Sequence, residues 1–166
     1  VRGGGDLGDN WHTEGKKKLK KNTFHDYIAC ANHLIEQRYT HKGGLCFYGG
    51  SAGGLTGGSV ANMAPELFFA MLLLVPFVDT MTTMLNEKLP LTPAEWELWG
   101  NPIKSKEYFD YRLSYSPYNN LDKKKYPPML ITSSIFDNRV LYSEPVKYIA
   151  KLRDVKEDEN EQLLKC

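Results

Sequence analysis

The chain has 166 residues, of which 42% are hydrophobic, and its 21 basic and 20 acidic side chains leave a formal net charge of +1. This length suffices for one domain with a buried core, and the near-neutral charge argues against nucleic acid or an anionic membrane as a partner. The longest apolar run, residues 67–78, contains Pro76 and is too short for a membrane helix. We therefore expect a soluble single domain that binds neither nucleic acid nor membrane.

The cysteines indicate a reducing compartment. Cys30, Cys46 and Cys166 are odd in number and lack C-x-x-C spacing, and no Asn-x-Ser/Thr acceptor occurs. These features favour a cytoplasmic protein. The chain opens on Val1-Arg2-Gly3, without a methionine or the apolar run of a signal peptide, so we interpret it as a piece of a larger protein.

Apolar periodicity predicts alternating strands and helices along the chain. Helical spacing is found over residues 22–39 and 141–153, and a small-residue helix is expected up to about residue 63. Apolar runs predict strands at residues 45–48, 67–78 and 128–136, and residues 162–166 resemble the start of another. This order predicts an α/β fold with a mostly parallel sheet and helices on both faces. Residues 80–127 show no sheet element, and we expect them to cover a site.

The stretch Gly49-Gly50-Ser51-Ala52-Gly53 matches the pattern G-x-S-x-G. A predicted strand precedes it and a predicted helix follows it, which is the context of a nucleophile elbow. In such an elbow the residues two before and two after the serine crowd each other and must be small. The Ala52 N–H at the helix start is placed to bind an oxyanion. The alternative is a glycine-rich turn with an idle serine.

A nucleophilic serine needs a base and an acid that orients the base. Asp137 directly follows the predicted strand that ends at Phe136, so we expect it at the same sheet edge as Ser51; Asp79, after the preceding strand, is the rival. The four histidines, His12, His25, His33 and His41, all precede Ser51. The usual order of serine, acid and histidine therefore predicts a base beyond Cys166.

Two other signals are weaker. Residues 3–8 spell G-x-G-x-x-G, but no strand precedes them and Asp9 does not resemble a helix start, so dinucleotide binding is not expected. The lysines of residues 16–21 could contact phosphate, yet without an opposing aromatic surface a solvated turn is the better interpretation. No Cys, His and carboxylate cluster has zinc-site spacing, so we expect neither metal nor cofactor.

Glu95 and Glu97 alternate with tryptophans inside the covering segment. Such a pair could bind a cationic side chain. Acids in the first turn of a helix are also stabilising in their own right, and spacing alone favours that ordinary explanation.

Several short blocks together resemble the catalytic domain of the prolyl oligopeptidase family, and within it the oligopeptidase B branch. In order along the chain they are RGGGDLGDNWH, GKKKLKKNTFHDY, YGGSAGG, PELF, VPFVD, WGNP, SYSPYNN and YSEP. The resemblance implies an α/β-hydrolase fold, of which residues 1–166 form a partial catalytic domain. The early strands, the β-propeller and the last strand with its histidine loop would be missing.

The same resemblance implies roles for individual residues. Ser51 matches the family nucleophile, Asp137 the triad acid and Ala52 the backbone donor of the oxyanion hole. The family histidine would fall shortly after Cys166, and a tyrosine donor would lie upstream of Val1. Neither group is within these residues.

The resemblance also implies a substrate site. Glu95 and Glu97 match the acidic pair with which oligopeptidase B binds a basic residue before the scissile bond, and Arg139 matches an arginine that holds a substrate carbonyl. Phe136 stands where oligopeptidase B usually has histidine, and Asn138 is a further small departure.

We therefore expect a cytoplasmic serine endopeptidase that cleaves short peptides after Arg or Lys through an acyl-enzyme. The 166 residues alone are expected to be inactive, because the triad histidine is not among them. Two alternatives stay open: a prolyl-specific peptidase or esterase of the same fold, and a non-catalytic fragment that serves as an interaction surface.

Overall fold

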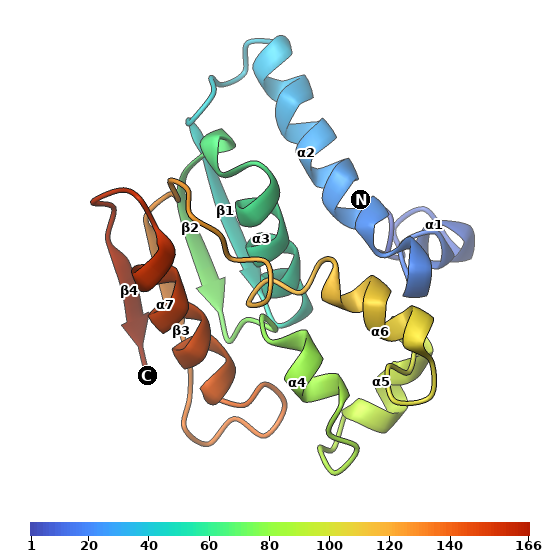
Figure 1. Ribbon diagram of the computed structural model, residues 1–166. Helices are drawn as coiled ribbons and strands as arrows, with labels where there is room; N and C mark the ends of the chain where they lie inside the picture. The colour runs from blue at the N-terminus through green and yellow to red at the C-terminus, as the bar shows by residue number, and fades with distance from the viewer.

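The computed structural model describes residues 1–166 and contains one parallel sheet flanked by helices (Figure 1). The strands are β1 (Leu45–Gly50), β2 (Phe68–Leu74), β3 (Met129–Thr132) and β4 (Gln162–Lys165). They lie side by side in chain order, and all three pairings are parallel. The last paired residues, Gly50, Leu74, Thr132 and Lys165, are in register, so the strands end at one common edge. The predicted α/β class and parallel sheet are confirmed.

Seven α-helices connect or cover the strands. They are α1 (Asp9–Thr13), α2 (Lys21–Glu36), α3 (Ala52–Met63), α4 (Thr80–Met84), α5 (Thr92–Trp99), α6 (Lys106–Leu113) and α7 (Ser143–Val155). The segment 80–127 holds α4, α5 and α6 and no strand, as its sequence predicts. No helix of the structure has the length and apolar character needed to cross a membrane.

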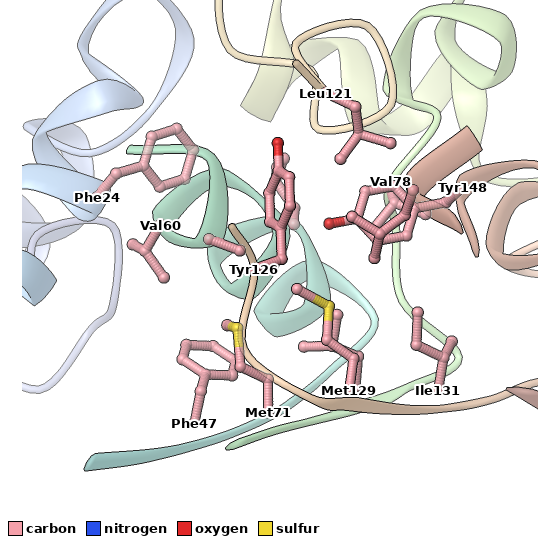
Figure 2. Close-up of a cluster of buried hydrophobic side chains, with 14 of the residues drawn as sticks. Phe24, Phe47, Val60, Met71, Val78, Leu121, Tyr126, Met129, Ile131 and Tyr148 are labelled. Atoms are coloured by element: carbon pink, nitrogen blue, oxygen red, sulfur yellow. The ribbon is translucent and has the colours of Figure 1, made fainter. Parts of the chain in front are cut away.

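The hydrophobic core lies between the sheet and the helices on one of its faces. Side chains alternate across a strand, and the inward ones, such as Phe47, Met71 and Ile131, are buried against residues of α3 and α7. Figure 2 shows these three pointing from the strands toward the layer that contains Val60 and Tyr148. Figure 1 shows α2, α3 and α7 on this same side. The expected covering of both faces is thus seen on one face only within these residues.

The opposite face of the sheet is exposed and largely apolar. Cys46 and Tyr48 of β1, Leu130 of β3 and Leu163 of β4 all project from it toward solvent. Faces of parallel sheets are normally buried, which explains why these strands are apolar on both sides.

Helix α3 approaches the sheet closely because its sequence is rich in glycine. A Cβ added at Gly54 would lie 2.3 Å from the Pro76 Cβ, which is far inside van der Waals contact. Glycine at this position therefore lets the helix start settle against the segment that follows β2.

Three sequence predictions are wrong in detail. Strand β2 ends at Leu74 rather than at Val78, so Asp79 does not directly follow a strand. Strand β3 ends at Thr132 rather than Phe136, and Phe136 is 94% exposed in a turn. Asp137 consequently follows a turn and does not come directly after the strand. The helix α1 does begin at Asp9, contrary to expectation, although Arg2 and Gly4 before it form only an isolated bridge and not a strand.

Candidate active site

Ser51 occupies the turn between β1 and α3, at the common edge where the strands end. Its backbone has φ 50° and ψ −119°, a conformation that residues other than glycine rarely adopt. Hydrogen bonds fix it on both sides: Ser51 N–H donates to the Leu74 carbonyl (3.0 Å), and the Ser51 carbonyl accepts from Gly54 N–H (2.8 Å) and Phe77 N–H (3.0 Å). The turn is therefore sharp, strongly anchored and exposed, as a nucleophile elbow requires.

The glycines around Ser51 are not equivalent. A Cβ at Gly49 would lie 3.0 Å from the Gly53 carbonyl oxygen and 2.8 Å from the Phe47 ring, so this position has no room for a side chain. At Gly53 an added Cβ would meet nothing within 4 Å. The predicted crowding across the turn is therefore present at Gly49 and absent at Gly53.

A small pocket of about 30 Å³ opens beside Ser51. It is lined by Ser51 and Ala52, by Glu95 from α5, by Arg139 from the loop after β3, and mainly by apolar side chains. The apolar and uncharged lining residues are Phe77, Thr83, Met84, Leu89, Leu91, Thr92, Trp99 and Val140. Four of the six predicted site residues thus meet in one pocket. Larger hollows of about 340 and 590 Å³ lie elsewhere and contain none of the six.

Ala52 is the first residue of α3, and it is exposed at the pocket wall. The first N–H groups of a helix have no intrahelical acceptor, and the positive end of the helix dipole lies there. This arrangement can stabilise negative charge that develops on an oxygen near Ser51.

Asp137 does not line the pocket but orders the loop that does. Its Oδ1 accepts hydrogen bonds from the backbone N–H groups of Arg139 (2.8 Å) and Val140 (3.0 Å). Its own N–H donates to the Ser134 carbonyl (3.1 Å). Both side-chain bonds go to Oδ1, so Oδ2 takes part in neither.

The side chain of the rival acid, Asp79, is buried and forms contacts that stabilise the fold. Its side chain is 2% exposed, its Oδ1 accepts from Thr82 N–H (3.4 Å) at the start of α4, and its Oδ2 pairs with Lys147 Nζ at 2.5 Å. The pair with Asp79 raises the pKa of Lys147. Asp79 is therefore already committed to holding α4 against α7, and it does not line the pocket of Ser51.

None of the four histidines lines the pocket of Ser51. His12 Nδ1 lies 3.1 Å from the Gly3 carbonyl oxygen near the N-terminus, and His41 Nδ1 lies 3.0 Å from the Lys42 carbonyl oxygen. His25 lines the separate hollow of about 340 Å³. The residues described here therefore place no imidazole beside the serine.

The structure separates Glu95 from Glu97. Glu95 reaches the pocket, where its Oε2 accepts a hydrogen bond from Trp99 Nε1 (2.8 Å). The Glu97 side chain is 88% exposed and pairs with Lys17 Nζ at 3.1 Å. Only one carboxylate of the predicted pair therefore faces the pocket.

One buried carboxyl group near the pocket, that of Glu144, is not predicted from the sequence. Glu144, at the start of α7, is 2% exposed and accepts from the N–H groups of Val78 (3.0 Å) and Asp79 (2.9 Å) and from the Thr83 hydroxyl. Burial raises the pKa of Glu144 to about 7. Thr83 itself lines the pocket, so this carboxyl supports one wall. Nothing in the local sequence, Tyr142-Ser143-Glu144-Pro145, distinguishes it from an ordinary helix start.

The lysine cluster also differs from the prediction of a solvated turn without aromatic partners. Lys20 Nζ lies 5.2 Å from the centroid of the Trp99 ring, and its burial lowers its pKa to about 8. Lys18 lies over Tyr108, and Lys21 lies over Tyr111. The expected absence of an aromatic surface is wrong, because α5 and α6 supply one from residues about 80 to 90 positions away in the sequence.

Comparison with known proteins places this geometry in a family. Residues 1–165 match the family described as "Prolyl oligopeptidase family". Protease 2 of Moraxella lacunata is 53% identical over 165 residues, which are 99% of this chain and 24% of that protein. Dipeptidyl aminopeptidase BI of Pseudoxanthomonas mexicana is 48% identical, over 93% of this chain and 21% of that protein.

Solved structures agree with the sequence matches. Oligopeptidase B from Leishmania major superposes with a TM-score of 0.96 at 48% identity, over 99% of this chain and 23% of that one. Oligopeptidase B from Trypanosoma brucei gives 0.96 at 51% identity, with the same coverage. The chain thus spans about a quarter of the length of the relatives that it matches. With its four-stranded parallel sheet corresponding to part of an α/β-hydrolase catalytic domain, the chain belongs to the prolyl oligopeptidase family of serine peptidases.

Proposed function

We propose that the complete protein containing these residues is a serine endopeptidase that cleaves short peptides after Arg or Lys. The observation that carries this proposal is the pocket beside Ser51, which has one carboxylate, Glu95, in a mainly apolar wall. Arg and Lys side chains combine an apolar stem with a cationic end, and this wall matches both parts.

The proposed reaction proceeds through an acyl-enzyme. The Ser51 Oγ attacks the scissile carbonyl carbon while a histidine from outside these residues takes the hydroxyl proton. Asp137 orients that histidine through Oδ2, and the Ala52 N–H donates to the oxyanion. When the C–N bond breaks, the histidine returns the proton to the leaving amine. Water, activated by the same histidine, then hydrolyses the ester and frees Ser51.

Two observations support the covalent chemistry. The backbone of Ser51 is held in a rare conformation by hydrogen bonds to Leu74 and Phe77, which keeps the hydroxyl exposed at the sheet edge. The oligopeptidase B structure from Trypanosoma brucei contains covalently bound antipain. Because no histidine lines the pocket, we expect the 166 residues alone to be inactive.

Binding of a long basic side chain requires the pocket to widen. Its volume of about 30 Å³ holds little more than one water molecule, so an arginine side chain does not fit in this arrangement. The segment between α4 and α5 contributes Leu89 and Leu91 to the wall. We propose that this segment moves to open the pocket. Arg139 is proposed to hold a substrate carbonyl, and Glu97 would contribute only after releasing Lys17.

We also propose that the protein is cytoplasmic. All three cysteines are free thiols and exposed, which suits the reducing cytoplasm.

Reporter peptides test the proposed function. We expect the complete protein to cleave after Arg or Lys at least ten-fold better, in kcat/KM, than after Pro or norleucine, a neutral residue of similar length. Ser51→Ala should abolish both this cleavage and labelling by a fluorophosphonate. Equal or better cleavage after Pro would refute the basic-residue specificity, and labelling that survives in Ser51→Ala would refute the nucleophile.

A further inference from the structure

Arg112, on α6, is a buried cation without a carboxylate partner. It is 0% exposed and forms no salt bridge. Burial lowers its pKa, while the nearby Tyr115 and Glu95 act in the opposite direction. Its Nε and Nη1 have no hydrogen-bond partner in the protein. Burying an unpaired guanidinium is unfavourable, so the contacts that Arg112 does make need an explanation.

Those contacts are at the end of α5, the helix that carries Glu95. Arg112 Nη2 donates to the Trp99 carbonyl (2.9 Å) and lies 3.5 Å from the Gly100 carbonyl. These are terminal carbonyls of α5, which have no intrahelical donor and carry the negative end of the helix dipole. A buried cation at this point therefore satisfies carbonyl groups at the end of the helix.

Trp99 connects this clamp to the pocket. The Arg112 Cζ lies 5.9 Å from the centroid of the Trp99 ring, and the same ring packs against Phe77 at 5.8 Å between centroids. The indole N–H donates to Glu95 Oε2 at 2.8 Å. Both Trp99 and Glu95 line the pocket, and Glu95 is its one carboxylate. The Glu95 carboxylate is thus hydrogen-bonded to a ring that Arg112, Lys20 and Phe77 surround.

We propose that Arg112 is a positioning residue for substrate selection: by clamping the end of α5 and the Trp99 indole, it turns Glu95 toward the pocket. Preference for a cationic substrate side chain then depends on a residue that the substrate never touches. This inference rests on the proposed function, because it takes Glu95 as the group that meets the substrate's charge.

The guanidinium suits this role better than an ammonium would. Its planar fork reaches a backbone carbonyl while its face lies near the indole, whereas lysine supplies one compact, strongly hydrated charge. Two variants of Arg112 therefore test the charge and the planar fork separately. Arg112→Lys keeps the charge but not the fork, and Arg112→Gln removes the charge while keeping a polar side chain of moderate length.

The chain offers a matched control in Arg153. It also donates to a backbone carbonyl, from Nε to the Gln162 oxygen at 3.0 Å, but it lies on α7 and does not line the pocket. Arg153 is exposed, so Arg153→Gln controls for the loss of a guanidinium-to-carbonyl hydrogen bond, and Arg112→Lys controls for the loss of the buried charge. An effect on substrate choice should be confined to Arg112.

The experiment measures kcat/KM of the complete protein for two peptides that differ only in Arg or norleucine before the scissile bond. We expect Arg112→Gln to lower the Arg-to-norleucine ratio roughly ten-fold, which corresponds to one charge-assisted hydrogen bond, mainly through KM. Arg112→Lys should lower it by a smaller factor, and Arg153→Gln should leave it unchanged. The rate of fluorophosphonate labelling of Ser51 should stay within about two-fold throughout.

The outcomes distinguish a failure of the proposed function from a failure of the role proposed for Arg112. A wild-type protein that does not distinguish the two peptides would refute the proposed function and this inference with it. A wild-type preference that survives in folded Arg112→Gln would refute the inference alone, as would equal losses for both peptides. If Arg112→Gln does not fold, Arg112→Lys decides by the same ratio.

Discussion

Replacing Glu144 by alanine removes the carboxyl group that joins the start of α7 to the turn between β2 and α4. In the folded protein this group accepts from two backbone N–H groups, those of Val78 and Asp79, and from the Thr83 hydroxyl. The first two donors are buried, and alanine offers no acceptor in place of the carboxyl oxygens. The change therefore leaves them without partners unless the turn opens.

The expected cost follows from the number of donors. A buried donor that loses its partner costs about 1–3 kcal/mol, so two N–H groups together give about 2–6 kcal/mol. Against a typical total stability of roughly 5–15 kcal/mol, that loss is large. Glu144→Gln is the matched control, because its carbonyl oxygen can accept from the N–H groups while its amide donates to the Thr83 oxygen. It should stay within about 1 kcal/mol of the wild type at a pH near 5.

Hydrogen exchange is the suitable assay, because it reports the free energy of opening of a local segment in a large protein. Exchange of the peptide that covers residues 75–85 should accelerate by at least about thirty-fold in Glu144→Ala and little in Glu144→Gln. A change of less than about five-fold in Glu144→Ala would refute the reasoning, since it would mean that Val78 and Asp79 N–H groups lose nothing when their acceptor is removed.

Three further predictions follow from particular groups. Burial raises the pKa of Glu144 from 4.5 to about 7, so the folded state binds an extra proton between these pH values. The stability of this turn should therefore be greatest below about pH 4.5. It should fall by at most about 3 kcal/mol as the pH rises through about 7. Urea titrations at several pH values check this, and Glu144→Gln should flatten the dependence. Gly54→Ala should destabilise the protein by about 1–3 kcal/mol, because its Cβ would lie 2.3 Å from Pro76. Gly53→Ala, whose Cβ meets open space, should leave the stability unchanged or raise it. Equal melting temperatures of the two variants would contradict this. Asp137→Asn retains the Oδ1 acceptor of its loop, so it should fold normally yet lower kcat by roughly 10⁴, and retention of kcat within about ten-fold would exclude Asp137 as the triad acid.

The elements that were predicted well have strong local patterns. Apolar residues at helical spacing predict a helix over 22–39, and α2 spans Lys21–Glu36 with Phe24 and Ala31 buried. The prediction of a strand to Phe136 is wrong because Ile135 and Phe136, though apolar, are exposed in a turn. Apolar character alone does not show which side chains the rest of the fold will cover.

The site residues likewise fall into those with a strong local sequence pattern and those without one. Ser51 and its turn could be predicted because the elbow is encoded in five consecutive residues, with close approach of the backbone at Gly49. The separation of Glu95 from Glu97 follows from the helix itself, since residues two apart on an α-helix point in nearly opposite directions. Arg112 and Glu144 could not be predicted, because their burial depends on tertiary contacts, with a partner 13 residues away for Arg112 and 65 residues away for Glu144.

The backbone conformation at Ser51 also places stability and chemistry in opposition at a single position. A positive φ costs a serine on the order of 1 kcal/mol or more that a glycine would not lose. Selection for a more stable fold would therefore favour glycine at position 51, and only selection for the hydroxyl would retain serine. Engineers who screen this domain for thermal stability alone should expect Ser51→Gly among the improved variants, each of them folded and without the hydroxyl that we propose as the nucleophile.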